Sequence, residues 1–213
     1  SIVDGMNQGR EGMNAGAAVN KRGETDSSNK NGINMSTALS IIEMCYGDTG
    51  LLLSMPRQGL GNSAIAAVAN EEQRQRFHGT WAAMAITEPG FGSDSAAIRT
   101  TATKDGDDYI LNGEKIFVTS GERADAVVVW ATLDKKLGRS AIKSFVVTKG
   151  TPGMKVARLE HKIGIKASDT ATIRLINCRV PAANLLGHAE IDVAKGVAGV
   201  METFDNTRPL VAA

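Results

Sequence analysis

The feature that most limits the fold is a run of short β-type segments between residues 83 and 178, with no helical pattern among them. The segments are rich in Ala, Val, Ile and Thr, and turn-forming residues separate one from the next. The pair Asn112-Gly113 predicts a hairpin turn, because both residue types tolerate positive φ. About seven short strands without helical crossovers predict a central antiparallel β-barrel or sandwich. The predicted strands are 83–86, 98–104, 109–111, 115–118, 126–132, 141–148, 155–159 and 170–178.

Helical patterns flank this β-rich region. Before it, the apolar spacing predicts a helix from about residue 34 and a break at 47–50. A second helix is predicted over 51–69, with an irregularity at Pro56, Gly59 and Gly61, and a charged helix over 71–78. The sequence therefore predicts an α+β protein. Its predicted parts are a loop or partly disordered segment at 1–32, a partial helical N-terminal domain at 33–81, a central antiparallel β-barrel domain at 82–190, and the first helix of a C-terminal helical bundle at 191–213.

Charge and composition exclude several function classes. With 24 Lys and Arg against 23 Asp and Glu, the net charge of +1 argues against a nucleic-acid-binding protein. No apolar run reaches the length of a membrane span. The two cysteines, Cys45 and Cys178, cannot form a disulfide framework, and we expect a reducing compartment. The histidines, His78, His161 and His188, lie far apart among charged or loop residues and are predicted to be on the surface.

A glycine-containing loop is the first candidate site. Residues 90–93 (GFGS) look like the start of a dinucleotide-binding fingerprint, but that motif requires a helix immediately after the glycines. A Thr-rich predicted strand follows instead, so we reject a Rossmann domain. A loop remains whose backbone N–H groups and small side chains can line a ligand.

The same loop carries a family resemblance. Residues 85–94 (AITEPGFGSD) resemble the loop signature of the acyl-CoA dehydrogenases, flavoenzymes that desaturate acyl-CoA thioesters between the α and β carbons. Further motifs resemble the family in the same order. They are 109–121 (YILNGEKIFVTSG), 162–171 (KIGIKASDTA), 179–187 (RVPAANLLG) and 201–213 (METFDNTRPLVAA), the last being similar to the medium-chain branch.

The resemblance implies three domains: a helical one, a β-barrel and a C-terminal four-helix bundle. Most of the third and part of the first are absent from the 213 residues. The sequence begins with Ser1 and stops at Ala213 inside an apolar helical pattern, so we expect it to be part of a longer chain.

The resemblance also implies non-covalent FAD and assigns its contacts. The first flavin segment supplies Met84, Ile86 and Thr87, with Gly92 and Ser93 near the flavin phosphate. The second supplies Phe117, Val118 and Thr119, with the Thr119 hydroxyl near the flavin N5. Phe117 stands where the family more often has Trp, which keeps an aromatic face but removes the indole donor.

Acyl-CoA contacts follow from the resemblance in the same way. Ser93 lies where the family touches both cofactor and acyl-CoA, and Arg139 is a weaker candidate because a solvated Arg is more common there. Phe91 stands where the family prefers a small residue, so packing against cofactor or substrate is expected to differ. The remaining substrate-side candidates are Asp205, Asn206, Thr207 and Arg208.

No catalytic residue is expected within this chain. Some family branches carry the glutamate base at the position of Thr207, which cannot act as that base, so we expect it beyond Ala213. Glu88 and Glu202 are interpreted as structural. The expected function is FAD-dependent α,β-desaturation in fatty acid β-oxidation, with electrons passed to an electron-transferring flavoprotein. The alternatives are an acyl-CoA oxidase and a non-catalytic flavin- or acyl-CoA-binding module. We expect a homotetramer, or at least a homodimer, in the bacterial cytoplasm or, for a eukaryotic protein, the mitochondrial matrix.

Overall fold

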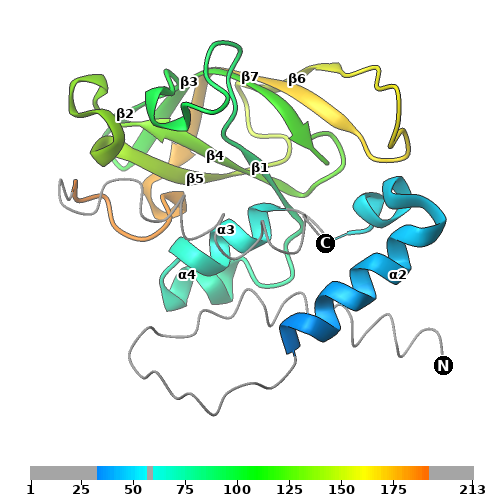
Figure 1. Ribbon diagram of the computed structural model, residues 1–213. Coiled ribbons are helices and arrows are strands. Elements are labelled where there is room, and N and C mark those ends of the chain that lie inside the picture. The colour runs from blue at the N-terminus through cyan, green and yellow to red at the C-terminus, as the bar shows by residue number, and fades with distance from the viewer. Residues whose placement is uncertain (1–32, 57–59, 192–213) are drawn as a thin grey trace.

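The computed structural model describes residues 33–56 and 60–191 (Figure 1). Helix α2 (Ile33–Ser54) contains the predicted break, because Asp48 has an extended backbone and its carboxylate accepts a hydrogen bond of 2.6 Å from the Gly50 N–H. The irregularity predicted at Pro56 within the helix 51–69 is a full interruption, since α2 ends at Ser54 and α3 (Leu60–Val68) is a separate helix. Proline disfavours helical backbone at the residue before it, which accounts for this interruption.

The short helix α4 (Glu71–Arg76) occupies most of the predicted helix 71–78. Asn70 and Gln73 form a capping box, which satisfies two backbone N–H groups at the start of the helix. The Gln73 side chain also donates a 2.6 Å hydrogen bond to the Leu185 carbonyl. A polar side chain near the start of α4 therefore fixes the helix to the segment that follows the last strand.

Seven strands form one curled sheet above α3 and α4 (Figure 1). The central strand β4 pairs with β5 along its length, and it also pairs with β1 and, at one residue, with β2. From β2 the sheet continues through β3 and β7 to β6. The strands are β1 (Ala82–Ala85), β2 (Thr101–Asp105), β3 (Asp108–Thr119), β4 (Ala126–Thr132), β5 (Ile142–Thr148), β6 (Met154–Leu159) and β7 (Thr170–Pro181).

The prediction of a purely antiparallel barrel is wrong in two respects. β1 pairs with β4 in parallel, and so does β2 at Thr101, while the other pairs are antiparallel. A parallel pair needs a long connection, and the β2–β3 hairpin between β1 and β4 supplies one without a helix. Among the described strands, β1, β5 and β6 each pair with a single neighbour, so the sheet does not close and forms an open half-barrel.

The predicted hairpin at Asn112-Gly113 is also wrong, because both residues lie inside the continuous strand β3. The turn between β2 and β3 is at Gly106-Asp107, where Gly106 has φ +61°. Gly113 is explained by close packing: a Cβ there would lie 2.3 Å from the Thr100 hydroxyl oxygen and 2.8 Å from the Thr100 Cα. The glycine therefore lets β3 pass against the residue that precedes β2.

Two apolar clusters make up the core, and β4 contributes to both. Val127, Val129 and Ala131 face the cluster inside the curled sheet, whereas Val128 and Trp130 face the cluster between the sheet and helices α3 and α4. Every residue of β4 is buried, because the strand is covered on both faces. The unbroken apolar run of β4 is thus a consequence of its central place.

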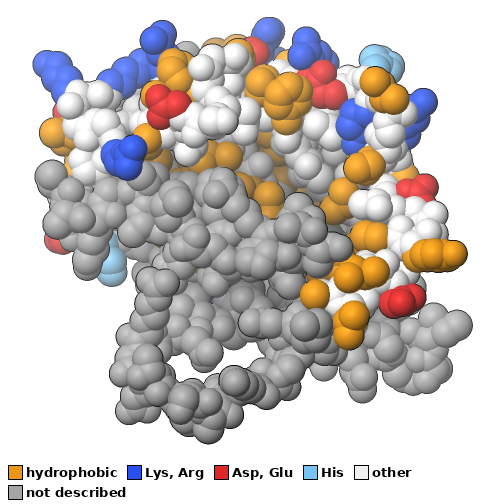
Figure 2. Space-filling view, in the orientation of Figure 1, with side chains coloured by type: hydrophobic (Ala, Val, Ile, Leu, Met, Phe, Trp, Pro, Cys, Tyr) orange, Lys and Arg blue, Asp and Glu red, His pale blue; other side chains and the backbone are white. Residues whose placement is uncertain are grey.

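Helix α2 exposes apolar side chains, which gather on the face of the helix seen in Figure 2. Leu39, Ile42, Tyr46 and Leu51 have exposed fractions of 44–92%. None of the helices in the described part of the chain has the length and apolar character that a membrane crossing needs. The predicted segment 1–32 and nearly all of the predicted helix 191–213 lie outside the described residues, and the division into domains stays a prediction.

Candidate functional site

The two segments predicted to bind flavin lie side by side. After β1, residues 86–88 run against β3, and the Ile116 N–H donates a 2.9 Å hydrogen bond to the Thr87 carbonyl. The Lys115 ammonium donates a 3.1 Å hydrogen bond to the Ile86 carbonyl. Residues about thirty positions apart in sequence therefore form one continuous surface at the end of β1.

A bulge in β3 directs an aromatic ring out of this surface. The pairing of β3 with β7 shifts between Lys115 and Val118, and Phe117 within the bulge has φ +57°. This conformation is strained for a bulky side chain, and such strain clusters at functional sites. Phe117 is 60% exposed and Thr119 is also exposed, whereas Val118 points into the core.

A buried ion pair lies directly behind the loop. Lys115 is fully buried, and its ammonium lies 2.8 Å from a Glu88 carboxylate oxygen. Burial lowers the pKa of Lys115 to about 8, against the opposing effect of Glu88. Burial alone would raise the pKa of Glu88, but the Lys115 charge and the hydrogen bonds to the carboxylate together hold it below its ordinary value. Both groups are therefore charged near neutral pH, and the structure agrees with the structural interpretation of Glu88.

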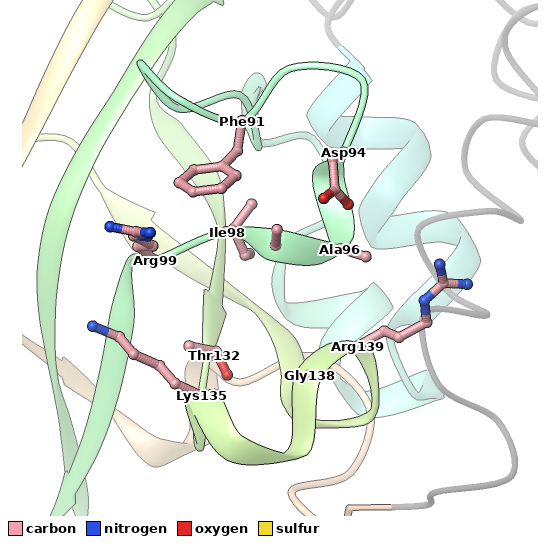
Figure 3. A pocket seen from close by; sticks show the side chains of 10 residues that line it. Phe91, Asp94, Ala96, Ile98, Arg99, Thr132, Lys135, Gly138 and Arg139 are labelled. Atoms are coloured by element: carbon pink, nitrogen blue, oxygen red, sulfur yellow. The ribbon is translucent and has the colours of Figure 1, made fainter.

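A cavity of about 490 Å³ opens beside the loop, where β2 meets β4 (Figure 3). The Thr132 hydroxyl at the end of β4 is buried and has no hydrogen-bond partner among the described residues. Such an orphaned group indicates a place for a water molecule or a ligand. The cavity is lined by Phe91, Asp94, Ala96, Ala97, Ile98, Arg99, Thr132, Lys135, Gly138 and Arg139.

Basic residues dominate the charge of this cavity. Arg99, Lys135 and Arg139 face one acidic residue, Asp94. The Arg99 guanidinium lies 4.9 Å from the centre of the Phe91 ring, a cation–π geometry visible in Figure 3. The combination of cations, an aromatic ring and small apolar residues suits a ligand with both phosphate and apolar parts.

The predicted site residues form three groups within the described part of the chain, and a fourth group lies outside it. Met84, Ile86, Thr87, Phe117, Val118 and Thr119 belong to the two adjoining segments, of which only Ile86 and Val118 have buried side chains. Gly92 and Ser93 are exposed, and a Cβ on Gly90 or Gly92 would meet no atom within 4 Å, so the backbone there is open to a ligand. Arg139 lines the cavity. The substrate-side candidates Asp205, Asn206, Thr207 and Arg208 lie outside the described residues.

Sequence reasoning missed Lys115, Arg99, Lys135 and Thr132. A signal for Lys115 is present, since Tyr109, Leu111 and Lys115 share one parity along β3 and all three are buried. A lysine in the inward phase of a strand requires a buried partner, which here is Glu88. The cavity residues carry no comparable pattern, because they converge from separate turns. The three histidines are exposed, as predicted.

Comparison with known families identifies the fold. The family described as "Acyl-CoA dehydrogenase, middle domain" matches residues 83–178, which include the curled sheet and the loop 86–94. The chain belongs to the acyl-CoA dehydrogenase family. The matched range includes the loop 86–94, the bulged strand β3 and the cavity beside them.

Similar proteins of this family are much longer than the chain. It is 39% identical over 153 residues to the acryloyl-CoA reductase (NADH) of Anaerotignum propionicum, a match that covers 68% of the chain and 38% of the relative. It is 40% identical over 156 residues to an acyl-CoA dehydrogenase of Bacillus subtilis, with 70% and 41% covered. A chain in a solved structure described as the electron transferring flavoprotein of Acidaminococcus fermentans superposes with a TM-score of 0.75 at 38% identity, with 84% and 48% covered. The chain thus spans about two fifths to half of the length of these relatives.

Proposed function

We propose that this chain is the cofactor-binding part of an FAD-dependent acyl-CoA dehydrogenase that desaturates an acyl-CoA thioester between its α and β carbons. One observation carries the proposal: the two segments with the family's flavin motifs are hydrogen-bonded to each other, next to a basic cavity. A site for a flavin and a site for a phosphorylated substrate are therefore adjacent.

The residues present fit FAD. The exposed ring of Phe117 on a strained bulge and the open backbone at Gly90 and Gly92 suit a flat aromatic cofactor with a diphosphate. When bound, FAD supplies the acceptor for the β-hydride. In this proposal the backbone of Met84 and Ile86, the Thr87 hydroxyl and the Thr119 hydroxyl donate hydrogen bonds to the cofactor.

The cavity is proposed to hold part of acyl-CoA. Arg99, Lys135 and Arg139 would bind its phosphate groups. Ser93 follows the open glycines and lies next in sequence to Asp94 of the cavity, which supports a contact with both ligands.

The catalytic base is proposed to be a glutamate outside residues 1–213. Glu88 is committed to the ion pair with Lys115, and Thr207 does not titrate near neutral pH. General-base catalysis is worth roughly 10²–10⁴-fold. We therefore expect residues 1–213 alone to give negligible turnover, while the full-length protein is active. Substantial activity of residues 1–213 would place a base among them, and Glu202 would be the first to replace.

An electron-transferring flavoprotein is the proposed acceptor, which the likeness to a chain of the Acidaminococcus fermentans structure supports. The two relatives named above are bacterial, which supports a bacterial cytoplasmic enzyme, and the family resemblance supports a homotetramer. Stopped-flow reoxidation of the reduced protein distinguishes the alternatives: slow reaction with oxygen and fast reaction with the flavoprotein are expected. Rapid oxygen turnover would indicate an acyl-CoA oxidase.

Cofactor binding is tested on the purified full-length protein. Heat should release FAD into the supernatant, since no covalent link to the flavin is expected. Sedimentation should show an oligomer that retains the flavin. Protein that neither carries FAD nor takes it up after reconstitution would contradict the proposal, and a protein that binds FAD and acyl-CoA without turnover would favour the non-catalytic module.

A further inference from the structure

The buried pair Glu88–Lys115 has more partners than ion pairing requires. Glu88 accepts hydrogen bonds from the backbone N–H groups of Arg99 at 2.7 Å and Thr100 at 2.9 Å, and from the Thr100 hydroxyl at 2.5 Å. Lys115 donates to Glu88 and to the Ile86 carbonyl. One carboxylate and one ammonium therefore connect three segments that are distant in sequence.

These segments belong to two different sites. Residues 86–88 and 115–116 belong to the two segments that contain the proposed flavin contacts, and the Ile116 N–H joins these segments by its hydrogen bond to the Thr87 carbonyl. Arg99 lines the cavity, and the carbonyl of the next residue, Thr100, accepts a 2.8 Å hydrogen bond from the N–H of Thr132, which also lines it. The ion pair thus lies between the cofactor surface and the cavity and bonds to the backbone of both.

Stability alone is a weak explanation for such a pair. Two buried charges lose hydration, and well-packed apolar residues of similar size often replace a buried ion pair without loss of stability. What an apolar pair cannot do is fix the positions of four backbone and hydroxyl groups through directed hydrogen bonds. The arrangement therefore favours a role in which the pair holds the three connected segments in fixed positions relative to one another.

We propose that the Glu88–Lys115 pair positions the flavin-binding segments and the wall of the acyl-CoA cavity relative to each other. Both are positioning residues that touch neither ligand. The inference rests on the proposed function, because it takes FAD and acyl-CoA as the ligands of the two surfaces.

The test compares ligand affinities of full-length variants at a temperature well below their melting temperatures. Glu88→Gln/Lys115→Met removes both charges together and leaves no unpaired buried ion. FAD affinity is measured by fluorescence titration of the apoprotein, and affinity for free coenzyme A by calorimetry on the flavin-loaded protein. We expect both dissociation constants to rise roughly tenfold or more, the order that loss of a charge-assisted hydrogen bond brings.

Val147→Ala is the matched control, since Val147 is fully buried in β5 and has no part in either surface. It should lower the melting temperature while both affinities stay at the wild-type level. Thr100→Val keeps the side-chain shape and removes one hydrogen-bond donor to Glu88, so it should raise both dissociation constants by a smaller factor. This variant replaces the double variant in the test if the double variant does not fold.

Three results would overturn the inference. In the first, the double variant binds both ligands with wild-type affinity. In the second, Val147→Ala weakens both affinities as much as the double variant does when the two proteins are equally stable. In the third, Thr100→Val and the double variant each weaken the binding of only one ligand. A wild-type protein that binds no FAD would instead overturn the proposed function, and with it this role.

Discussion

Replacing Gly61 with alanine should destabilise the protein, although alanine is the better helix former. Gly61 is a buried residue of α3, which crosses β1 at this point. A Cβ on Gly61 would lie 2.3 Å from the Ala83 carbonyl oxygen, 2.5 Å from that of Ala82 and 2.6 Å from the Ala82 carbonyl carbon. All three atoms are backbone, so no side chain can move aside and α3 itself must shift.

The size of the effect follows from two opposing contributions. Glycine to alanine within a helix gains about 1 kcal/mol, whereas overpacking of a buried contact costs about 1–3 kcal/mol. Three overlaps with fixed atoms place Gly61→Ala at the upper end of that cost, so the net loss should be about 2 kcal/mol. For a chain of this size, that corresponds to a fall of about 4–8 °C in melting temperature.

The assay is urea unfolding followed by circular dichroism, with Gly47→Ala as the matched control. Gly47 is an exposed residue of α2, and a Cβ there would meet no atom within 4 Å. The control should be neutral or stabilised by up to about 1 kcal/mol. Two outcomes would refute the reasoning that close packing of α3 on β1 controls the stability of Gly61→Ala. In one, Gly61→Ala is as stable as the wild type; in the other, the free energies of unfolding of both variants change in the same direction.

Three further outcomes test other parts of the structure. Burial raises the pKa of the Cys178 thiol to about 11, whereas Cys45 is partly exposed. At about pH 8 a thiol reagent should therefore modify Cys45 in the folded protein and Cys178 only after unfolding. Modification of Cys178 in the folded protein would contradict its burial. Because the pKa of Glu88 is lowered in the folded state, its stabilisation is present above the ordinary carboxylate pKa and is lost as pH falls through the lowered value. Glu88→Gln should therefore show a shallower acid dependence of the free energy of unfolding, and an unchanged slope would speak against the ion pair. Phe117→Gly relieves a strained φ, so the apoprotein of this variant should be at least as stable as the wild type while it binds FAD more weakly. A less stable apoprotein that binds FAD with wild-type affinity would refute a cofactor role for the Phe117 ring.

Local sequence rules predicted the strands of the β-rich region well, and β4 was predicted to the residue. They failed where a choice depends on distant residues. Both Asn112-Gly113 and Gly106-Asp107 suit a tight turn. The chain turns at Gly106-Asp107, whereas strand β3 continues through Asn112-Gly113, where Gly113 packs closely against Thr100. The parallel pairing of β1 with β4 is likewise non-local, since it joins strands separated by a whole hairpin.

The candidate site was predictable to a similar degree. The fold brings residues 86–87 beside residues 115–116, which directly precede the predicted contacts 117–119, and the motifs indicated both segments; their role in flavin binding stays a prediction. Of the cavity residues, only Arg139 and the neighbours of Ser93 were indicated by the motifs, because Thr132 and Lys135 come near Arg99 only through the pairing of β2 with β4. Tertiary contacts of this kind leave no periodic trace in the sequence.

Anaerobic reduction of the bound flavin by acyl-CoA tests the central claim most directly. The full-length protein, loaded with FAD, is mixed with a panel of acyl-CoA esters while the visible absorption of the flavin is followed. The account predicts that at least one ester bleaches the flavin and yields the α,β-unsaturated thioester. Flavin that stays oxidised with every ester, in protein shown to bind both FAD and coenzyme A, would contradict it.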